Sequence, residues 1–289
     1  MTLQITFIGG KIDPVEAKNR CIRFGKIKKS DVETGIGVIQ DDVIQYDVKA
    51  FLSMLQEMIK YNDITGIKVY YACYDPANPV DVAYIPANKN GMLTLIFVPT
   101  IEKKGSLLYD NLTKDYYIMN KTGDGFVNLN KPPQPNGLAS RWVGTYQGDV
   151  LPNLLNGMDT KSTWYELQEV LETIKVINEG INNQTINSML YSFASYKKGD
   201  KIDRTLANGQ RIKVDIDNKL SGIFWFGIDL KSDNFMEIIH GDGTFEKALA
   251  YKNNEPEKFE KKFRLLADPD PYDTGIPIPP ASGVDPQLP

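Results

Sequence analysis

The chain has 289 residues, of which 42% are hydrophobic and 24% are charged, and its formal charge at pH 7 is −4. This composition is typical of a folded globular protein and excludes a disordered chain. The slightly acidic balance gives no general attraction to nucleic-acid phosphates, so we expect no nucleic-acid partner. The longest apolar runs, 93–98 and 223–228, are much shorter than a membrane span of about 20 residues, so we also expect no membrane partner.

The two cysteines, Cys21 and Cys73, are too few for a disulfide framework. Both lie among apolar neighbours, where a free thiol behaves as a small hydrophobic side chain. Residues 1–11 lack the basic start of a signal peptide, and their apolar stretch is too short for one. These features together predict a cytoplasmic protein.

Two helices are predicted before residue 60. Asp13 and Pro14 open the first, because aspartate caps free backbone N–H groups and proline fits the first helical position. Asp47 caps the second in the same way. Apolar residues recur through the second helix at three- and four-residue steps, at Val48, Phe51, Leu52, Leu55, Met58 and Ile59. One face of this helix is therefore predicted to be buried.

A strand is predicted at 66–74, directly after the second helix. Side chains alternate along it, with Ile67, Val69, Tyr71 and Cys73 on one face and Lys68, Tyr70, Ala72 and Tyr74 on the other. Further on, Asn90-Gly91 is a hairpin signal that predicts pairing between 81–86 and 92–98. Helix followed by small antiparallel sheet indicates the α+β class.

The order of helix, strand and strand returns in the second half of the chain. Residues 165–174 align with 46–55 so that every apolar position of the helix is matched, and 191–196 resembles 69–74. Strands that begin with glycine follow in both halves, at 91–98 and 222–228. We interpret this as a diverged duplication. Chance likeness between two common elements is the alternative.

The predicted fold is therefore α+β, with two diverged helix–strand–strand repeats that each carry a small, mainly antiparallel sheet. The first repeat spans 1–120 and the second 151–267. Between them, 121–150 is a Pro/Gly-rich connection, in which Trp142 and Tyr146 require something to pack against. Residues 268–289 hold seven prolines and are predicted to form an extended or disordered tail.

Within the second repeat, Thr163 and Glu166 form a capping box that predicts a helix from 163 to a C-terminal stop at Gly180. The spacing in 185–196 fits a strand or a helix, and the repeat favours a strand. The remaining predicted elements are strands at 212–216 and 224–230 and a basic helix at 255–266.

Motifs for catalysis or metal binding are scarce. The one histidine, His240, precedes a Gly-Asp-Gly turn, and a second Gly-Asp-Gly stands at 123–125. The acidic groups Asp215/Asp217 and Asp268/Asp270/Asp273 lack the glycine and terminal glutamate of a calcium loop. The sequence therefore predicts no metal site and no cofactor, and it assigns no catalytic residue.

Aromatic residues are the most suggestive candidates for a binding site. Tyr70 and Tyr74 share one face of a strand, Tyr196 and Trp225 hold comparable places in the second half, and Asp75 ends the first strand. A sheet face rich in rings can form a stacking or peptide-binding surface, so we take these five residues as candidate ligand-binding residues. The alternative is that a helix covers this face and the rings belong to the core.

Three stretches resemble a group of uncharacterised bacterial proteins. These are Val15-Glu16-Ala17, Gly66-Ile-Lys-Val-Tyr-Tyr-Ala72 and Thr94-Leu-Ile-Phe-Val-Pro-Thr100, and they are similar to the Glu-Ala helix and the two strands that the group shares. The resemblance covers the first third of the chain and implies a bacterial protein without implying an activity. The Cys-Pro-Pro ending of the group appears here only as Ile278-Pro-Pro280.

Our first interpretation is a non-enzymatic binding or protein-interaction protein, which holds an unidentified protein or small ligand in an inter-repeat groove or on an aromatic sheet face. A hydrolase-type enzyme with acidic residues in that groove is the alternative, and a structural subunit of an assembly is a third interpretation. Several convergent carboxylates in a compact pocket would favour the enzyme. A shallow aromatic surface would favour the binding protein.

Overall fold

The computed structural model describes residues 12, 14–102, 109–111, 115–129, 137–205, 211–232, 270–272 and 276–278. The helices are α1 Pro14–Ile27, α2 Lys29–Ile36, α3 Val48–Met58, α4 Pro79–Val82, α5 Leu138–Thr145 and α6 Leu167–Asn182, and the short turns Tyr146–Val150, Leu151–Asn153 and Leu155–Gly157 follow α5. The strands are β1 Val43–Tyr46, β2 Gly66–Cys73, β3 Leu93–Glu102, β4 Tyr109–Asn111, β5 Tyr117–Met119, β6 Phe126–Asn128, β7 Ser162–Glu166, β8 Ser188–Ser195, β9 Lys201–Thr205, β10 Arg211–Asp215, β11 Leu220–Gly227, β12 Asp270–Tyr272 and β13 Ile276–Ile278.

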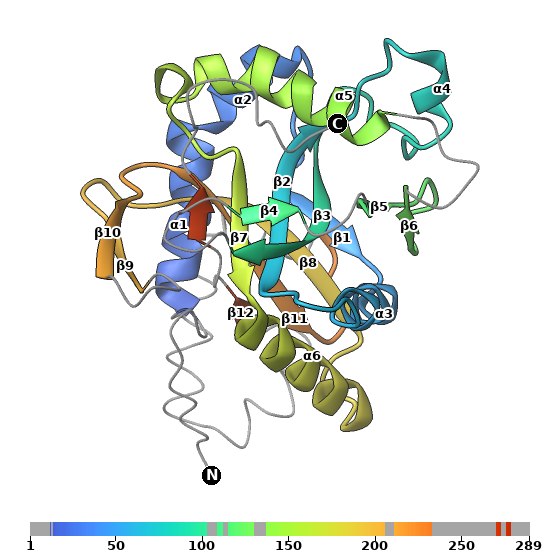
Figure 1. The fold of residues 1–289 in the computed structure, drawn as a ribbon. Helices are drawn as coiled ribbons and strands as arrows, with labels where there is room; N and C mark the ends of the chain where they lie inside the picture. Colours follow the sequence, from blue (N-terminus) through green and yellow to red (C-terminus); the bar gives the residue numbers. More distant parts are fainter. Residues whose placement is uncertain are drawn as a thin grey trace.

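These strands form two main sheets and a hairpin (Figure 1). Sheet A has the order β1-β8-β11-β12, and sheet B has the order β13-β7-β2-β3-β5-β6, with β4 also paired to β3. The hairpin consists of β9 and β10. Every strand pair within the described ranges is antiparallel. The predicted α+β class is confirmed.

The two sheets exchange strands between the two halves of the chain. In chain order, the first half contributes β1, α3, β2 and β3, and the second half contributes β7, α6, β8 and β11. β1 pairs with β8 of the second half, whereas β7 pairs with β2 of the first half. Each sheet therefore draws on both halves and does not follow the predicted boundaries at 120 and 151. The shared order agrees with the proposed repeat, and the duplication itself remains a prediction.

The core lies between the inner faces of the two sheets. Side chains of β2, β3, β8 and β11 pack there together with the apolar stripes of α3 and α6, which contact each other. On the outer side of sheet B, α5 covers Tyr70, Ala72 and Tyr74, and on the outer side of sheet A, α1 covers Leu190 and Trp225. The result is a layered order of helix, sheet, sheet and helix. α3 and α6 lie at the lower end of the strands in Figure 1.

The predictions for α3 and β2 are confirmed. The Asp47 side chain accepts a hydrogen bond of 2.8 Å from the Ala50 N–H, as expected for an N-cap. The predicted stripe of α3 is buried apart from Ile59, which is half-buried. In β2 the two predicted faces point into different clusters, so both sides of this strand are covered.

The predicted helix start at Thr163 is wrong. Residues 162–166 form β7, because they find hydrogen-bonding partners along β2, and α6 begins only at Leu167. Glu166 is the N-cap, and its backbone N–H donates a 2.8 Å hydrogen bond to the Glu169 carboxylate. The predicted stop at Gly180 is also wrong, since α6 continues to Asn182 and Gly180 leaves room for Ile186. For 185–196 the preferred strand is confirmed as β8.

Two further predictions need correction. The hairpin predicted between 81–86 and 92–98 does not form, because β3 pairs with β2, and Asn78 caps the short helix α4. The connection predicted at 121–150 contains β6 and the helix α5, whose Leu138, Trp142 and Val143 are buried against sheet B. The four-residue spacing of Leu138 and Trp142 therefore indicates the structure of this stretch better than its glycine and proline content does.

Parts of the proline-rich tail also join the sheets. β12 pairs with β11 in sheet A, and β13 pairs with β7 in sheet B. The tail was predicted as extended or disordered, and these two pieces are strands. His240, Asp268, Asp273 and the predicted helix at 255–266 lie outside the described residues.

A test of the sheet packing is available at Gly222 in β11. A Cβ at this position would overlap the hydroxyl and ring of Tyr191, which is buried between the sheets. We expect Gly222→Ala to lower the free energy of unfolding by about 1–3 kcal/mol, the usual cost of overpacking. Urea unfolding followed by tryptophan fluorescence measures this.

Gly144→Ala is the matched control, because nothing lies within 4 Å of a Cβ added there. Gly144 belongs to α5, so alanine should leave stability unchanged or raise it by up to ~1 kcal/mol. Equal stability of the two variants would contradict the close approach of β11 to Tyr191.

Candidate functional site

A pocket opens between α3, α6 and the inner faces of both sheets. It encloses about 400 Å³, counted with its open mouth. Ten residues line it, namely Phe51, Leu55, Ile67, Val69, Phe97, Tyr165, Glu169, Val170, Thr173 and Phe224. The first five belong to the first half of the chain and the last five to the second half. The pocket therefore draws its wall from both halves of the chain.

The strand exchange places Tyr165 in this pocket. Tyr165 lies on β7, where it is the cross-strand partner of Ile67 on β2. Its ring centroid is 5.9 Å from that of Phe224, which comes from sheet A. The two sheets thus contact each other through these rings at the wall of the pocket.

Two further aromatic rings, those of Phe51 and Phe97, belong to the wall of the pocket. Phe51 of α3 packs edge-on against Phe97 with ring centroids 5.8 Å apart, and it lies 5.5 Å from the ring of Phe224. Rings held by several neighbours have little freedom to rotate, and such aromatic walls are common in pockets for small organic ligands.

Two polar side chains of α6, Glu169 and Thr173, complete the lining. The Glu169 carboxylate accepts the hydrogen bond from the Glu166 N–H, and the Thr173 hydroxyl donates to the Glu169 carbonyl oxygen over 2.9 Å. Glu169 is 7% exposed and stands in the first turn of α6, where the helix dipole stabilises a negative charge. It is the one carboxylate among the ten lining residues.

The structure does not bring the aromatic candidates together. Tyr70 and Tyr74 lie under α5, where Tyr74 contacts the Trp142 ring edge-on at 4.9 Å. Trp225 lies under α1 and donates a 2.7 Å hydrogen bond from Nε1 to the Ser192 hydroxyl. All three rings are buried, so they line no exposed sheet face.

The remaining two candidates, Tyr196 and Asp75, lie in two further parts of the structure. Tyr196 is buried with Val214 and Ile216, and the Arg20 guanidinium lies 4.6 Å above its ring. Asp75 follows the end of β2 and accepts hydrogen bonds from the Ala77 N–H and the Thr145 hydroxyl. None of the five candidates lines the pocket.

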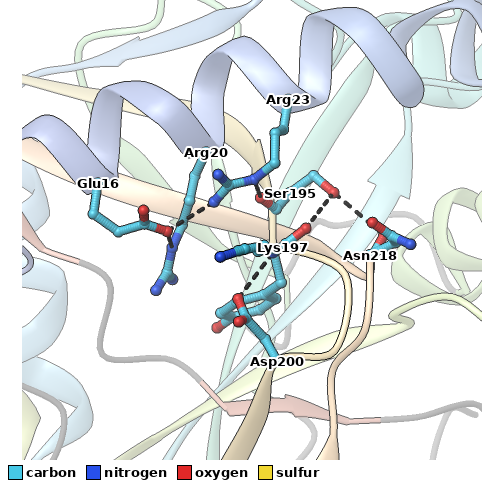
Figure 2. A network of polar contacts seen from close by, with 8 residues as sticks. Glu16, Arg20, Arg23, Ser195, Lys197, Asp200 and Asn218 are labelled. Carbon is cyan, nitrogen blue, oxygen red and sulfur yellow. Dashed lines mark hydrogen bonds and ion pairs between the residues drawn. The ribbon is translucent and has the colours of Figure 1, made fainter.

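A polar network near Tyr196 fastens α1 to the end of β8 (Figure 2). Arg20 and Arg23 both donate to one carboxylate oxygen of Glu16, over 3.0 and 2.7 Å, and Arg23 also donates to the Ser195 carbonyl oxygen over 3.0 Å. Partial burial of Glu16 opposes its charged form, but the two arginines outweigh this effect and lower its pKa. Each of these three charged side chains has a hydrogen-bonding partner within the protein, so we interpret the network as a structural contact between α1 and β8.

Several buried titratable side chains are held in their neutral form. Burial raises the pKa of the Cys73 thiol, and the nearby charges of Asp149 and Asp75 add to the effect, so Cys73 stays protonated and unreactive. Burial likewise raises the pKa values of Tyr146 and Tyr191. Within the described ranges, no group of three or more His, Cys, Asp and Glu side chains is placed to hold a metal ion.

Comparison with known proteins found no match. No family model, no curated protein and no solved structure is similar to this chain. Among the described helices, none has the length and apolar character needed to span a bilayer. The functional argument therefore rests on the pocket.

Most of the pocket residues carried no functional signal in the sequence. Phe51, Leu55 and Val69 had the periodicity of core residues and are indeed mostly enclosed. Glu169 could have been found, because a strand that ends at Glu166 leaves Glu166 and Glu169 in the spacing of a capping box.

The Glu16 network predicts a pH-dependent contribution to stability. Because its pKa is lower in the folded state, the stabilisation is present above the ordinary pKa of glutamate and is lost as pH falls through the folded value. The effect should stay below ~1 kcal/mol, since surface ion pairs are weak and the side chain of Glu16 is 36% exposed.

Urea unfolding of the native chain and Glu16→Gln at pH 7 and pH 3 measures the effect. The difference between the two proteins should shrink at pH 3. Glu179→Gln is the control, because Glu179 lies 3.9 Å from Lys175 on an exposed helix face. If the difference in the free energy of unfolding between the native chain and Glu16→Gln is as large at pH 3 as at pH 7, the ionised Glu16 carboxylate is not the source of the stabilisation.

Proposed function

We propose that this protein is a non-enzymatic binding protein whose inter-repeat pocket holds a small, largely apolar ligand. The observation that carries the proposal is the composition of the wall, in which eight of the ten lining residues are aliphatic or aromatic.

The position of the pocket supports the same proposal. Its walls come from α3, α6 and strands of both sheets. The strands are hydrogen-bonded within their own sheets, so the site forms between elements that the rest of the fold holds in place. Binding to such a preformed site avoids the free-energy cost of ordering a loop around the ligand.

The hydrolase alternative finds less support. Hydrolysis by paired acids needs two carboxyl groups on either side of the reacting bond. The pocket wall offers Glu169 alone, and that carboxylate already accepts the Glu166 N–H.

The proposal includes a cytoplasmic location in a bacterial cell. Cys21 and Cys73 are both buried free thiols, which suits a reducing compartment. Fractionation of the source cells and detection of the chain with an antibody tests the location. Recovery from the periplasm or the medium would contradict it.

Binding can be tested with the neutral fluorescent probe N-phenyl-1-naphthylamine. We expect saturable binding at one site, with the blue-shifted emission of an apolar environment. Val170→Phe should weaken binding at least tenfold, because Val170 lines the pocket and a larger side chain fills it.

Leu171→Phe is the control on the same helix. Leu171 does not line the pocket and is 41% exposed, so enlarging its side chain to phenylalanine should leave probe binding unchanged. Absence of saturable binding to the native chain, or equal loss in both variants, would contradict the proposed function.

A further inference from the structure

The charge in the pocket narrows the class of ligand. Glu169 stands among aromatic and aliphatic side chains, and it is the one carboxylate among the lining residues. A carboxylate in a largely apolar site interacts more strongly with other charges than it would in water, because the local dielectric constant is lower.

Two interactions favour the negative form of this carboxylate. Its oxygen Oε2 accepts a 2.8 Å hydrogen bond from the Glu166 backbone N–H, and a bond of this kind favours the charged carboxylate. Its place in the first turn of α6 puts it near the positive end of the helix dipole. Both interactions stabilise the anion before any ligand arrives.

The aromatic rings of the wall also favour a positively charged ligand. Phe51, Phe97, Tyr165 and Phe224 line the pocket, and the faces of aromatic rings attract cations. An anionic ligand would meet the Glu169 carboxylate at short range and lose its own hydration, so the pocket disfavours it.

We propose that the pocket selects small organic ammonium compounds, with one ring for the apolar walls and a protonated amine for Glu169. This inference rests on the proposed function and specifies the ligand that the same site takes. A single ring is a compact apolar group, which suits a pocket whose mouth is open to solvent.

Three probes with the same ring and different charge test the inference by isothermal titration calorimetry at pH 7. They are 2-phenylethylammonium, 2-phenylethanol and 3-phenylpropanoate. We expect the ammonium compound to bind at least tenfold more tightly than the carboxylate, with the alcohol between them. Displacement of N-phenyl-1-naphthylamine shows that the probes share its site.

Glu169→Gln assigns the selectivity to one side chain. Glutamine retains the capping hydrogen bond to the Glu166 N–H, so the variant should fold, and it removes the charge. Affinity for the ammonium probe should fall to within twofold of that for the alcohol, whose own affinity should not change. Glu179→Gln makes the same charge change on an exposed part of α6 outside the pocket and should have no effect.

The outcomes separate the two proposals. If neither N-phenyl-1-naphthylamine nor any of the three probes binds, the proposed function fails and the inference fails with it. If the fluorescent probe binds but the three charge forms bind equally, or the carboxylate binds best, the proposed function stands and the inference is overturned. Tight ammonium binding that survives in Glu169→Gln also overturns it.

Discussion

The exchange of strands between the two halves of the chain is the constraint on which the rest of the structure depends. β1 lies beside β8 and β7 lies beside β2, so neither sheet can be completed by one half alone. In each half the exchanged strand leads almost directly into a helix. α3 therefore starts from β1 at the edge of sheet A, and α6 starts from β7, which lies between β13 and β2 in sheet B. The two helices contact each other where the two sheets approach.

The pocket is a consequence of this arrangement. Two helices and two sheets that meet at one place do not fill all the space between them, and the rings of Phe51, Tyr165 and Phe224 cover the walls that remain. The same junction supplies the charge, because β7 ends at Glu166 and α6 begins at once, with Glu169 in its first turn. A buried carboxylate costs free energy unless it is hydrogen-bonded, and the cap provides that bond.

The candidate aromatic residues show that the alternation along a single strand does not reveal whether a face is exposed or buried. Tyr70 and Tyr74 do share a face of β2, as their alternation predicts, but α5 covers that face. The covering helix comes from a stretch whose glycines and prolines indicated a connection. A ring on a strand is equally suited to an exposed surface and to a core, and only the neighbouring layer distinguishes the two.

The local elements could be predicted from the sequence. Periodicity identified the buried stripe of α3, the two faces of β2 and the α+β class, because these depend on neighbours a few residues apart. It did not determine that 162–166 is a strand, that α5 covers sheet B, or that Glu169 lies in a pocket. Those features depend on pairing and packing between residues far apart in the chain, such as Ile67 with Tyr165. Local sequence patterns contain no information about such distant partners, so the position of the pocket became visible only in the folded chain.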